Sequence, residues 1–322
     1  MIVLGVDENG LGPLLGPLIA TCVGLRVSRY QRPRLLRLGR ELGIDDSKVT
    51  AGFGAMGFAE GLCLAVVEAL TGRLPVDADA VCDALFLEDP GKVRSRCPAR
   101  SRAQCWGAPL SLPCFGGDIE QGRLVLGTLR SRGVEVVYLR SGVACTGDLN
   151  RRLEAGQSRV EVDLELMELL VLDAHRTAGE SLRAVCGMVG GIRKYEDRLR
   201  HLPEGARPAK QRADGARAYT FPGLGEVSFE IDADSRHFPV ALASMVGKYV
   251  RELWMERQNR FYRSRDPALA AVSGYHDPVT KRFMAQSEPL RVELGISDAC
   301  FVRDSAKATK QRHQLALLDC LL

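Results

Sequence analysis

The order of apolar and polar positions predicts strands first, then alternating strands and helices, and finally mostly helix. Residues 2–6 form a short apolar run that predicts a buried strand. After a glycine-rich turn, residues 17–27 predict a second strand that pairs with the first in an antiparallel way. Residues 134–139, 181–191 and 225–235 predict further strands. Together they favour a mixed α/β sheet with an antiparallel front and a parallel back.

Helical spacing of apolar residues predicts three longer helices. One contains residues 58–70, and a second covers residues 160–179 and ends at a glycine. A third, long helix follows Pro239 and ends in a basic stretch. We therefore expect a core domain over residues 1–238 and a C-terminal helical lobe over residues 239–322.

The pattern is lost between about residues 75 and 122, where proline, glycine, cysteine and arginine are frequent. We interpret this segment as an irregular insertion, because unstructured loops of this length are uncommon in compact domains unless they carry function or disorder. It contains Cys82, Cys97, Cys105 and Cys114, but no two of them have the close spacing of structural zinc sites. The partner of the insertion is not specified by the sequence.

Composition narrows the class of protein without fixing its function. The chain has 322 residues, of which 46% are hydrophobic, and a formal charge of +4. No apolar run approaches the length of about 20 residues that spans a membrane, and the start lacks signal-peptide features. We therefore expect no membrane association and a cytoplasmic location, with the ten cysteines as small buried side chains. The charge tolerates a polyanionic partner without requiring one.

Asp7 and Glu8 stand at the end of the first predicted strand, directly before a turn that contains Gly10, Gly12 and Gly16. Adjacent residues of a regular strand point to opposite faces, so both carboxylates reach one site only where the strand stops. An ordinary turn with two solvated carboxylates is one reading. A phosphate-binding loop is another, but the spacing is not G-x-G-x-x-G, and two carboxylates would repel a phosphate. Bound Mg²⁺ or Mn²⁺ would remove that conflict, because hard oxygen ligands suit these ions.

Four blocks of the sequence resemble one known family, the type 2 ribonucleases H (ribonucleases HII and HIII). "GVDENGLGPLLGPL" is similar to the family's opening motif, and "DDSKVT" to its Asp-Ser-Lys block. "DADSRHFPVALASMVGKYVRE" resembles its Ala-Asp-Ser segment with the helix that follows, and "SGYHDP" its late Gly-Tyr motif. The blocks occur in the family's order, from residue 5 to about residue 276.

This resemblance implies a ribonuclease H-like mixed sheet with flanking helices and a C-terminal helical lobe. It also implies hydrolysis of RNA/DNA hybrid, or of ribonucleotides embedded in duplex DNA. Family members hold two divalent ions with four carboxylates, and Asp7, Glu8 and Asp234 match three of these as metal ligands and catalytic residues. Two such ions would activate a water and stabilise the leaving oxygen of an in-line displacement.

The resemblance also implies a set of substrate-binding residues. The family's glycine loop contacts the ribonucleotide near its 2′-hydroxyl, largely through its backbone, and its tyrosine stacks on a sugar ring. Its Asp-Ser-Lys block places a positive charge near the scissile backbone. The matching positions in this chain are Gly10, Leu11, Gly12, Ser47, Lys48 and Tyr275. A surface lysine and a packing tyrosine are the plainer readings of Lys48 and Tyr275.

Two positions depart from the family pattern. The third carboxylate is expected near Gly187, but no acidic residue lies between residues 181 and 195, and Leu11 replaces the family's basic residue. These departures predict weakened cleavage, with an inactive hybrid-binding or interaction protein as the alternative. Asp173 lies in mid-helix and is a poor substitute ligand. Asp232 would share a strand face with Asp234 if the strand continued that far, although a solvated acidic edge is the simpler reading.

Overall fold

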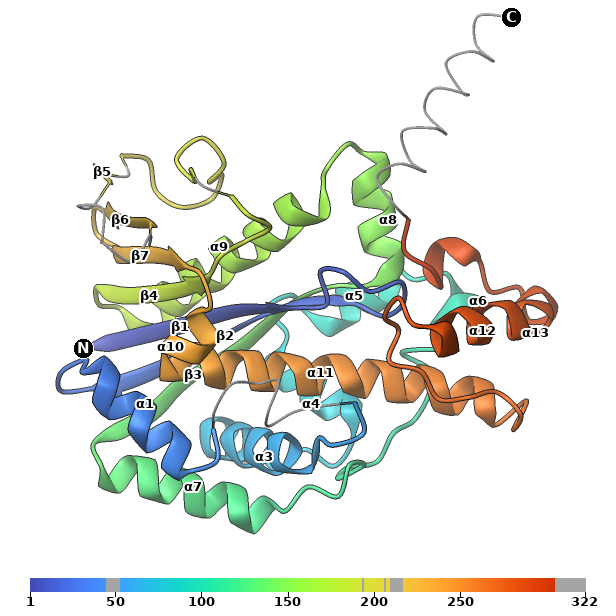
Figure 1. Cartoon of the computed structure of the whole chain (residues 1–322), viewed down its shortest axis with the longest axis horizontal. Coiled ribbons are helices and arrows are strands. Elements are labelled where there is room, and N and C mark those ends of the chain that lie inside the picture. Colours follow the sequence, from blue (N-terminus) through green and yellow to red (C-terminus); the bar gives the residue numbers. More distant parts are fainter. Residues whose placement is uncertain (45–52, 193, 206, 209–216, 305–322) are drawn as a thin grey trace, which may run out of the picture.

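The computed structural model describes residues 1–44, 53–192, 194–205, 207–208 and 217–304. One seven-stranded sheet has the order β3-β2-β1-β4-β7-β6-β5 (Figure 1). β1 pairs in parallel with β4, and β4 with β7, whereas β2 is antiparallel to both β1 and β3. The strands are β1 (Ile2–Asn9), β2 (Leu18–Val27), β3 (Val134–Ala144), β4 (Leu182–Gly187), β5 (Arg207–Pro208), β6 (Arg217–Phe221) and β7 (Gly225–Glu230). The predicted antiparallel front is confirmed. The predicted parallel back is confirmed only for β1, β4 and β7, because β6 is antiparallel to both β7 and β5.

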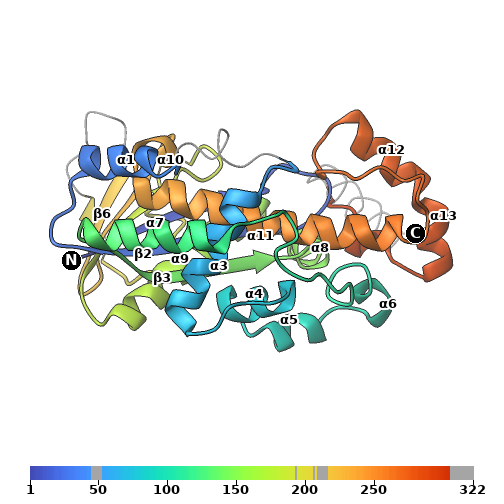
Figure 2. The same cartoon turned by 90° about the horizontal axis from the view of Figure 1, so that it is seen from below.

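Helices cover both faces of this sheet (Figures 1 and 2). On one face lie α8 (Thr146–Glu154) and α9 (Arg159–Ala178), and on the other α1 (Arg32–Glu41), α3 (Gly57–Thr71), α7 (Ile119–Ser131) and α11 (Phe238–Arg263). The predicted α/β class, a mixed sheet with flanking helices and a C-terminal helical lobe, is confirmed. No helix in the described ranges is both long and apolar enough to cross a membrane.

Strand β1 separates two apolar cores, because its side chains alternate between the two faces. Val3 belongs to the core on the α11 side, while Leu4 and Val6 belong to the core on the α9 side. Gly5 faces α11, where an added Cβ would lie only 2.1 Å from the backbone of Pro239. The absence of a side chain at Gly5 therefore allows the start of α11 to approach the end of β1.

The segment 75–122 is not the irregular insertion that its composition predicted. It contains α4 (Ala78–Leu85), α5 (Pro90–Ser95), α6 (Ala99–Arg102) and the start of α7. Asp77, Asp89 and Asp118 cap three of these helices by accepting backbone N–H groups. Helices of four to eight residues are too short to show a clear apolar period, which explains the wrong prediction.

Beyond the sheet, a small third core joins the end of α11 to the C-terminal helices α12 (Pro278–Gln286) and α13 (Glu288–Leu294) and the short 3₁₀ helix η1 (Asp298–Cys300). The first half of α11 instead packs on β1 and β2, since its residues Ala241–Val246 belong to the core that also contains Val3. The proposed boundary between residues 238 and 239 stays a prediction.

The strand predicted over residues 225–235 ends earlier than its sequence suggested. β7 stops at Glu230, Asp232 has a left-handed backbone with φ 49°, and Asp234 lies in the short helix α10 (Ala233–Arg236). The expectation that Asp232 shares a strand face with Asp234 is therefore wrong. The alternation of acidic residues in this segment resembled a strand, but the chain turns away from the sheet there.

Glu60 of α3 anchors the segment before α7 to the core. Its buried carboxylate accepts the backbone N–H groups of Cys114, Phe115 and Gly117 at 2.8 to 2.9 Å. We expect Glu60→Ala to lower the free energy of unfolding by about 3 kcal/mol, because three backbone donors, one buried and two part-buried, lose their carboxyl acceptor. Urea unfolding followed by circular dichroism measures this loss. The exposed Glu41→Ala is the control, and equal midpoints for the two variants would contradict the anchoring role.

Candidate active site

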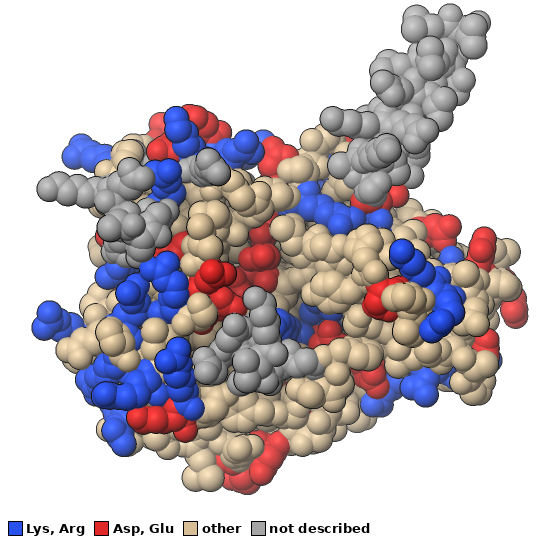
Figure 3. Space-filling model, in the orientation of Figure 1, with Lys and Arg blue, Asp and Glu red and all other residues tan. Residues whose placement is uncertain are grey.

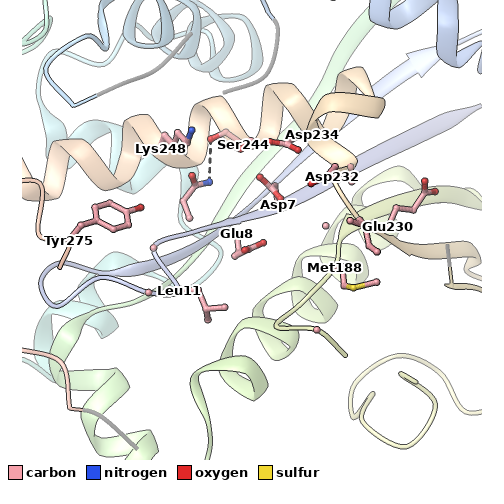
Figure 4. A pocket seen from close by; sticks show the side chains of 17 residues that line it. Asp7, Glu8, Leu11, Met188, Glu230, Asp232, Asp234, Ser244, Lys248 and Tyr275 are labelled. Carbon is pink, nitrogen blue, oxygen red and sulfur yellow. Dashed lines mark hydrogen bonds between the residues drawn. The ribbon is translucent and has the colours of Figure 1, made fainter. Parts of the chain in front are cut away.

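An open cavity of about 490 Å³ lies where the parallel strands β1, β4 and β7 end, between α11 and the glycine loop. Figure 3 shows acidic side chains gathered in this hollow, with basic side chains on the surface beside it. Figure 4 shows the side chains that line it. Five of them are acidic: Asp7, Glu8, Glu230, Asp232 and Asp234. The cavity combines these acids with exposed loop backbone, which is the chemistry expected of a site for a cation and a polyanion together.

Asp7 and Glu8 enter the cavity from opposite faces of β1. Asp7 follows Val3 and Gly5 on the α11 side, and a hydrogen bond from Ser244 of α11 contacts its carboxylate. The side-chain amide of Asn9 donates to the backbone oxygen of Ser244 at 3.2 Å and ties the strand end to α11 (Figure 4). Glu8 follows Leu4 and Val6 on the α9 side. The two carboxylates therefore reach the end of the strand from opposite faces.

Asp234 reaches the same cavity from α10, close to Asp7 (Figure 4). Asp234 falls in the segment 225–235 that was predicted to be one strand, and this prediction is wrong at Asp234. Asp234 lies in a helix, and β4 separates β7 from β1. The turn after β7 nevertheless carries Asp234 across the end of β4 to the side of Asp7.

Burial and neighbouring negative charges raise the pKa of two carboxylates in this cavity. Burial raises the pKa of Asp7 well above its ordinary value, and the charges on Glu8 and Asp234 add to the effect. Burial also raises the pKa of Glu8 to about 7, with a further contribution from Asp234. Both shifts oppose ionisation, so a cation between these groups would lower the free energy of their charged forms.

The carboxylates of the cavity are suitable ligands for a divalent cation, but they stand too far apart to hold one together. Oxygen ligands from Asp7, Glu8 and Asp234 are those that Mg²⁺ and Mn²⁺ prefer. Within the described ranges, however, no three side chains of histidine, cysteine, aspartate or glutamate stand close enough together to hold an ion. Binding an ion would therefore require these carboxylates to move toward one another.

Gly187 ends β4 beside the two carboxylates of β1. A Cβ added to this glycine would lie 2.6 Å from Oδ1 of Asp7 and 3.5 Å from Oε2 of Glu8. A side chain at position 187 would therefore project directly into the acidic cluster. The structure thus places Gly187 where the sequence comparison located the missing third carboxylate.

Glu230 lines the cavity but already has partners. Its carboxylate lies 3.1 Å from the hydroxyl oxygen of Ser228 and 2.9 Å from Nε2 of His237, and Nδ1 of His237 lies 2.6 Å from the hydroxyl of Tyr30. Glu230, His237 and Ser228 are all buried. This chain of contacts ties Glu230 to the segment before α1.

Three arginines from distant parts of the chain hold the glycine loop. Arg303 donates to the carbonyl oxygens of Gly10 and Gly16, Arg251 to that of Leu15, and Arg159 to that of Leu11. His276 Nε2 lies 3.1 Å from the carbonyl oxygen of Gly12. Five loop carbonyls thus contact side chains, and the loop conformation depends on residues that follow it by 148 to 293 positions.

The three arginines place positive charge behind the glycine loop. Burial and the neighbouring charges on Arg251 and Arg159 lower the pKa of Arg303 well below its ordinary value. The guanidinium carbon of Arg251 lies 4.8 Å from the ring centroid of Tyr275, whose side chain is 47% exposed at the cavity rim. Leu11 itself carries no charge, so the cationic groups near this loop come from α9, α11 and the C-terminal segment.

The predicted substrate residues divide into two groups. Gly10, Leu11, Gly12 and Tyr275 line the cavity, and Ser244 and Lys248 of α11 do so as well. Ser47 and Lys48 lie outside the described residues. Sequence reasoning missed the roles of Arg159, Arg251 and Arg303. Arg251 lay inside a block that resembles the family, but no pattern linked Arg159 or Arg303 to the loop.

No protein-family model and no curated protein matches the chain. Among solved structures, the chain is similar to one described as a PCNA–RNase HII complex from Archaeoglobus fulgidus, with 19% identity, a TM-score of 0.45 and 94% of each chain covered. It is also similar to ribonuclease H2 from Pyrococcus horikoshii OT3, with 16% identity, a TM-score of 0.46 and 98% and 99% of the two chains covered.

A third similar structure is Bst-RNase HIII in complex with Mn²⁺, with 13% identity and a TM-score of 0.47. This likeness covers 96% of the present chain and 68% of the other. All three structures are of ribonucleases HII or HIII, the family that the sequence blocks resemble. At such low identities and TM-scores, the likenesses assign no activity to this chain.

The raised pKa of Glu8 predicts a pH-dependent stability of the metal-free protein. Since Glu8 binds its proton more tightly in the folded state, its stabilising contribution is complete below pH 4.5 and is lost as the pH rises through about 7. Glu8→Gln should therefore raise the melting temperature at pH 8 and have little effect at pH 4.5. Thermal unfolding in chelator measures the difference. The exposed Glu154→Gln should show no such pH dependence. If the melting temperatures of Glu8→Gln and the natural chain differ by the same amount at every pH, the raised pKa is not that of Glu8.

Proposed function

We propose that the protein is a divalent-metal-dependent nuclease that hydrolyses phosphodiester bonds of RNA/DNA hybrid, or of ribonucleotides embedded in duplex DNA. The observation that carries this proposal is the convergence of Asp7, Glu8 and Asp234 on one open cavity bordered by a glycine loop. The four sequence blocks that resemble type 2 ribonucleases H supply the substrate class. Similar solved structures are ribonucleases HII and HIII, which agrees with this choice.

Asp7, Glu8 and Asp234 would hold the metal, Mg²⁺ or Mn²⁺, with carboxylate oxygens. A bound divalent ion in such a site supplies a nucleophilic water and charge stabilisation for phosphoryl transfer. The protein's own contribution is orientation. Ser244 contacts the Asp7 carboxylate from α11, and the bond from Asn9 to Ser244 holds the strand end against that helix.

The loop of Gly10, Leu11 and Gly12 would receive the nucleic-acid backbone. Its carbonyl oxygens at these three positions contact Arg303, Arg159 and His276, which orients the remaining backbone groups of the loop toward the cavity. Tyr275 stands at the rim with its ring on Arg251, and an exposed aromatic face of this kind can stack on a sugar or a base. Ser47 and Lys48 would add contacts to the backbone near the scissile bond.

Glycine at position 187 favours a weakened enzyme over one of full strength. The loss of a direct metal ligand should cost at least the roughly 10- to 100-fold that changes in a ligand's supporting shell cost. The second candidate function is binding of hybrid or ribonucleotide-containing duplex without efficient cleavage, and the same glycine favours it. The two candidates share the substrate and differ only in turnover.

Single-turnover cleavage of hybrid in Mn²⁺ tests the proposal at Gly187. We expect weak cleavage by the natural chain and at least about a 10-fold gain in Gly187→Asp, which restores a carboxylate beside Asp7. Gly187→Ala is the matched control, because it also places a Cβ 2.6 Å from the Asp7 oxygen but adds no ligand. It should show no gain.

Two results would count against this account. Full-strength cleavage by the natural chain would show that no ligand is missing. A complete lack of cleavage in Gly187→Asp, together with binding of hybrid by both proteins, would favour the binding function over the nuclease.

Binding of ribonucleotide-containing duplex at several salt concentrations separates the roles of Lys48 and Tyr275. Lys48→Ala should weaken binding and reduce the slope of log affinity against log salt by about 1, because one phosphate contact is lost. Tyr275→Ala should weaken binding with little change in slope, because stacking releases no counterions. Fluorescence anisotropy measures both effects, and equal slope changes would show that the roles are misassigned.

A further inference from the structure

Asp163 is a buried acid that the sequence comparison did not single out. It lies in the second turn of α9, on the helix side that faces the sheet, and its exposure is 0%. Its neighbour Val162 belongs to the core cluster that contains Val6 of β1 and Cys186 of β4. Asp163 therefore lies beneath the strand ends that border the cavity.

Both carboxylate oxygens of Asp163 lack a hydrogen-bond partner among the described residues. The other buried acids among the described residues have hydrogen-bond partners. Glu60 accepts three backbone N–H groups, Glu168 accepts those of residues 200–202, and Glu230 contacts Ser228 and His237. An unpartnered buried carboxyl costs about 1 to 3 kcal/mol or more, so it needs an explanation beyond packing.

The charged groups that act on Asp163 are both negative. Burial raises the pKa of Asp163 well above its ordinary value, and the charges on Glu8 and then Asp7 raise it further. The same acid also raises the pKa of the Cys186 thiol, which places it near the end of β4 as well. A carboxyl between two acids, with no donor of its own, lacks a positive partner.

The two faces of β1 explain why this position matters. Asp7, Asp234 and the space beside Gly187 lie on the α11 side, where the third carboxylate is missing. Glu8 points to the α9 side, where α9 packs against β1 and β4 and presents Asp163. On the α11 side of β1 the carboxylate at position 187 is missing, whereas on the α9 side Asp163 supplies one.

We propose that Asp163 is a ligand of the divalent cation and that, with Glu8, it partly compensates for the carboxylate absent at Gly187. The inference rests on the proposed metal-dependent function and names a ligand that this function did not include. Since no three acidic side chains in the described ranges stand within reach of one ion, the proposal requires Glu8 and Asp163 to move toward a shared ion beneath the end of β1.

Titration of Mn²⁺ into the full chain, without nucleic acid, tests this inference. Isothermal calorimetry and the Mn²⁺-induced rise in melting temperature are the two readouts. Asp163→Asn keeps the shape of the side chain and should bind Mn²⁺ at least about 10-fold more weakly, with a smaller thermal shift. Asp173→Asn is the matched control on the same helix, because its carboxylate already contacts Tyr138 and Arg176, and it should bind Mn²⁺ like the natural chain.

The metal-free melting temperature at pH 8 shows whether Asp163→Asn is folded, and we expect it to equal or exceed that of the natural chain. Unchanged Mn²⁺ affinity in Asp163→Asn would overturn the inference, even if the natural chain cleaves hybrid. Failure of the natural chain to bind Mn²⁺ would overturn both proposals. Mn²⁺ binding that depends on Asp163, without cleavage of any hybrid, would uphold the ligand and refute the nuclease.

Discussion

Repulsion between carboxylates at the end of β1 is the constraint on which the site depends. Asp7, Glu8, Asp234 and Asp163 come from one strand and two helices, and burial raises the pKa of three of them. A fold that only needed stability would separate these groups or give each one hydrogen-bond donors, as it gives Glu60 three backbone N–H groups. The concentration of acid therefore indicates a positively charged ligand.

The glycine loop shows the opposite arrangement a short distance away. Arg159, Arg251 and Arg303 gather behind it and donate to its backbone carbonyl oxygens. Burial lowers the pKa of Arg303, and repulsion from Arg251 and Arg159 lowers it further. The acids and the arginines thus lie on two sides of one turn, so the cavity between them can attract a cation and a phosphate together, as hydrolysis of a phosphodiester requires.

The two departures from the family pattern, Gly187 and Leu11, have the same consequence for the charge around the cavity. Each removes a charged side chain from the cavity, and in each case a charge of the same sign lies nearby on another element. Asp163 acts on Cys186, the residue before Gly187, while Arg159 contacts the carbonyl oxygen of Leu11 and Arg303 that of Gly10. The charges remain around the site, while the helices and the C-terminal segment supply them instead of β4 and the loop.

The sequence by itself determined the parts of the protein that depend on local pattern. Apolar runs and helical periods predicted β1, β2, β4, α3 and α9, and the strand-end acids with their glycines located the site at Asp7 and Glu8. Local pattern failed where elements are short, as in residues 75–122, or where alternation continued past a turn, as at Asp232 and Asp234.

Only the tertiary structure decided which distant residues complete the site. Asp163 occupies a core position of α9, four residues before Met167 and seven before Leu170, and a lone acid at that position was a signal in the sequence. Its neighbours Glu8 and Asp7 are more than 150 residues away, as Arg303 is from Gly10. No local period reports such contacts, because they arise from the packing of α9 and the C-terminal segment against the ends of the sheet.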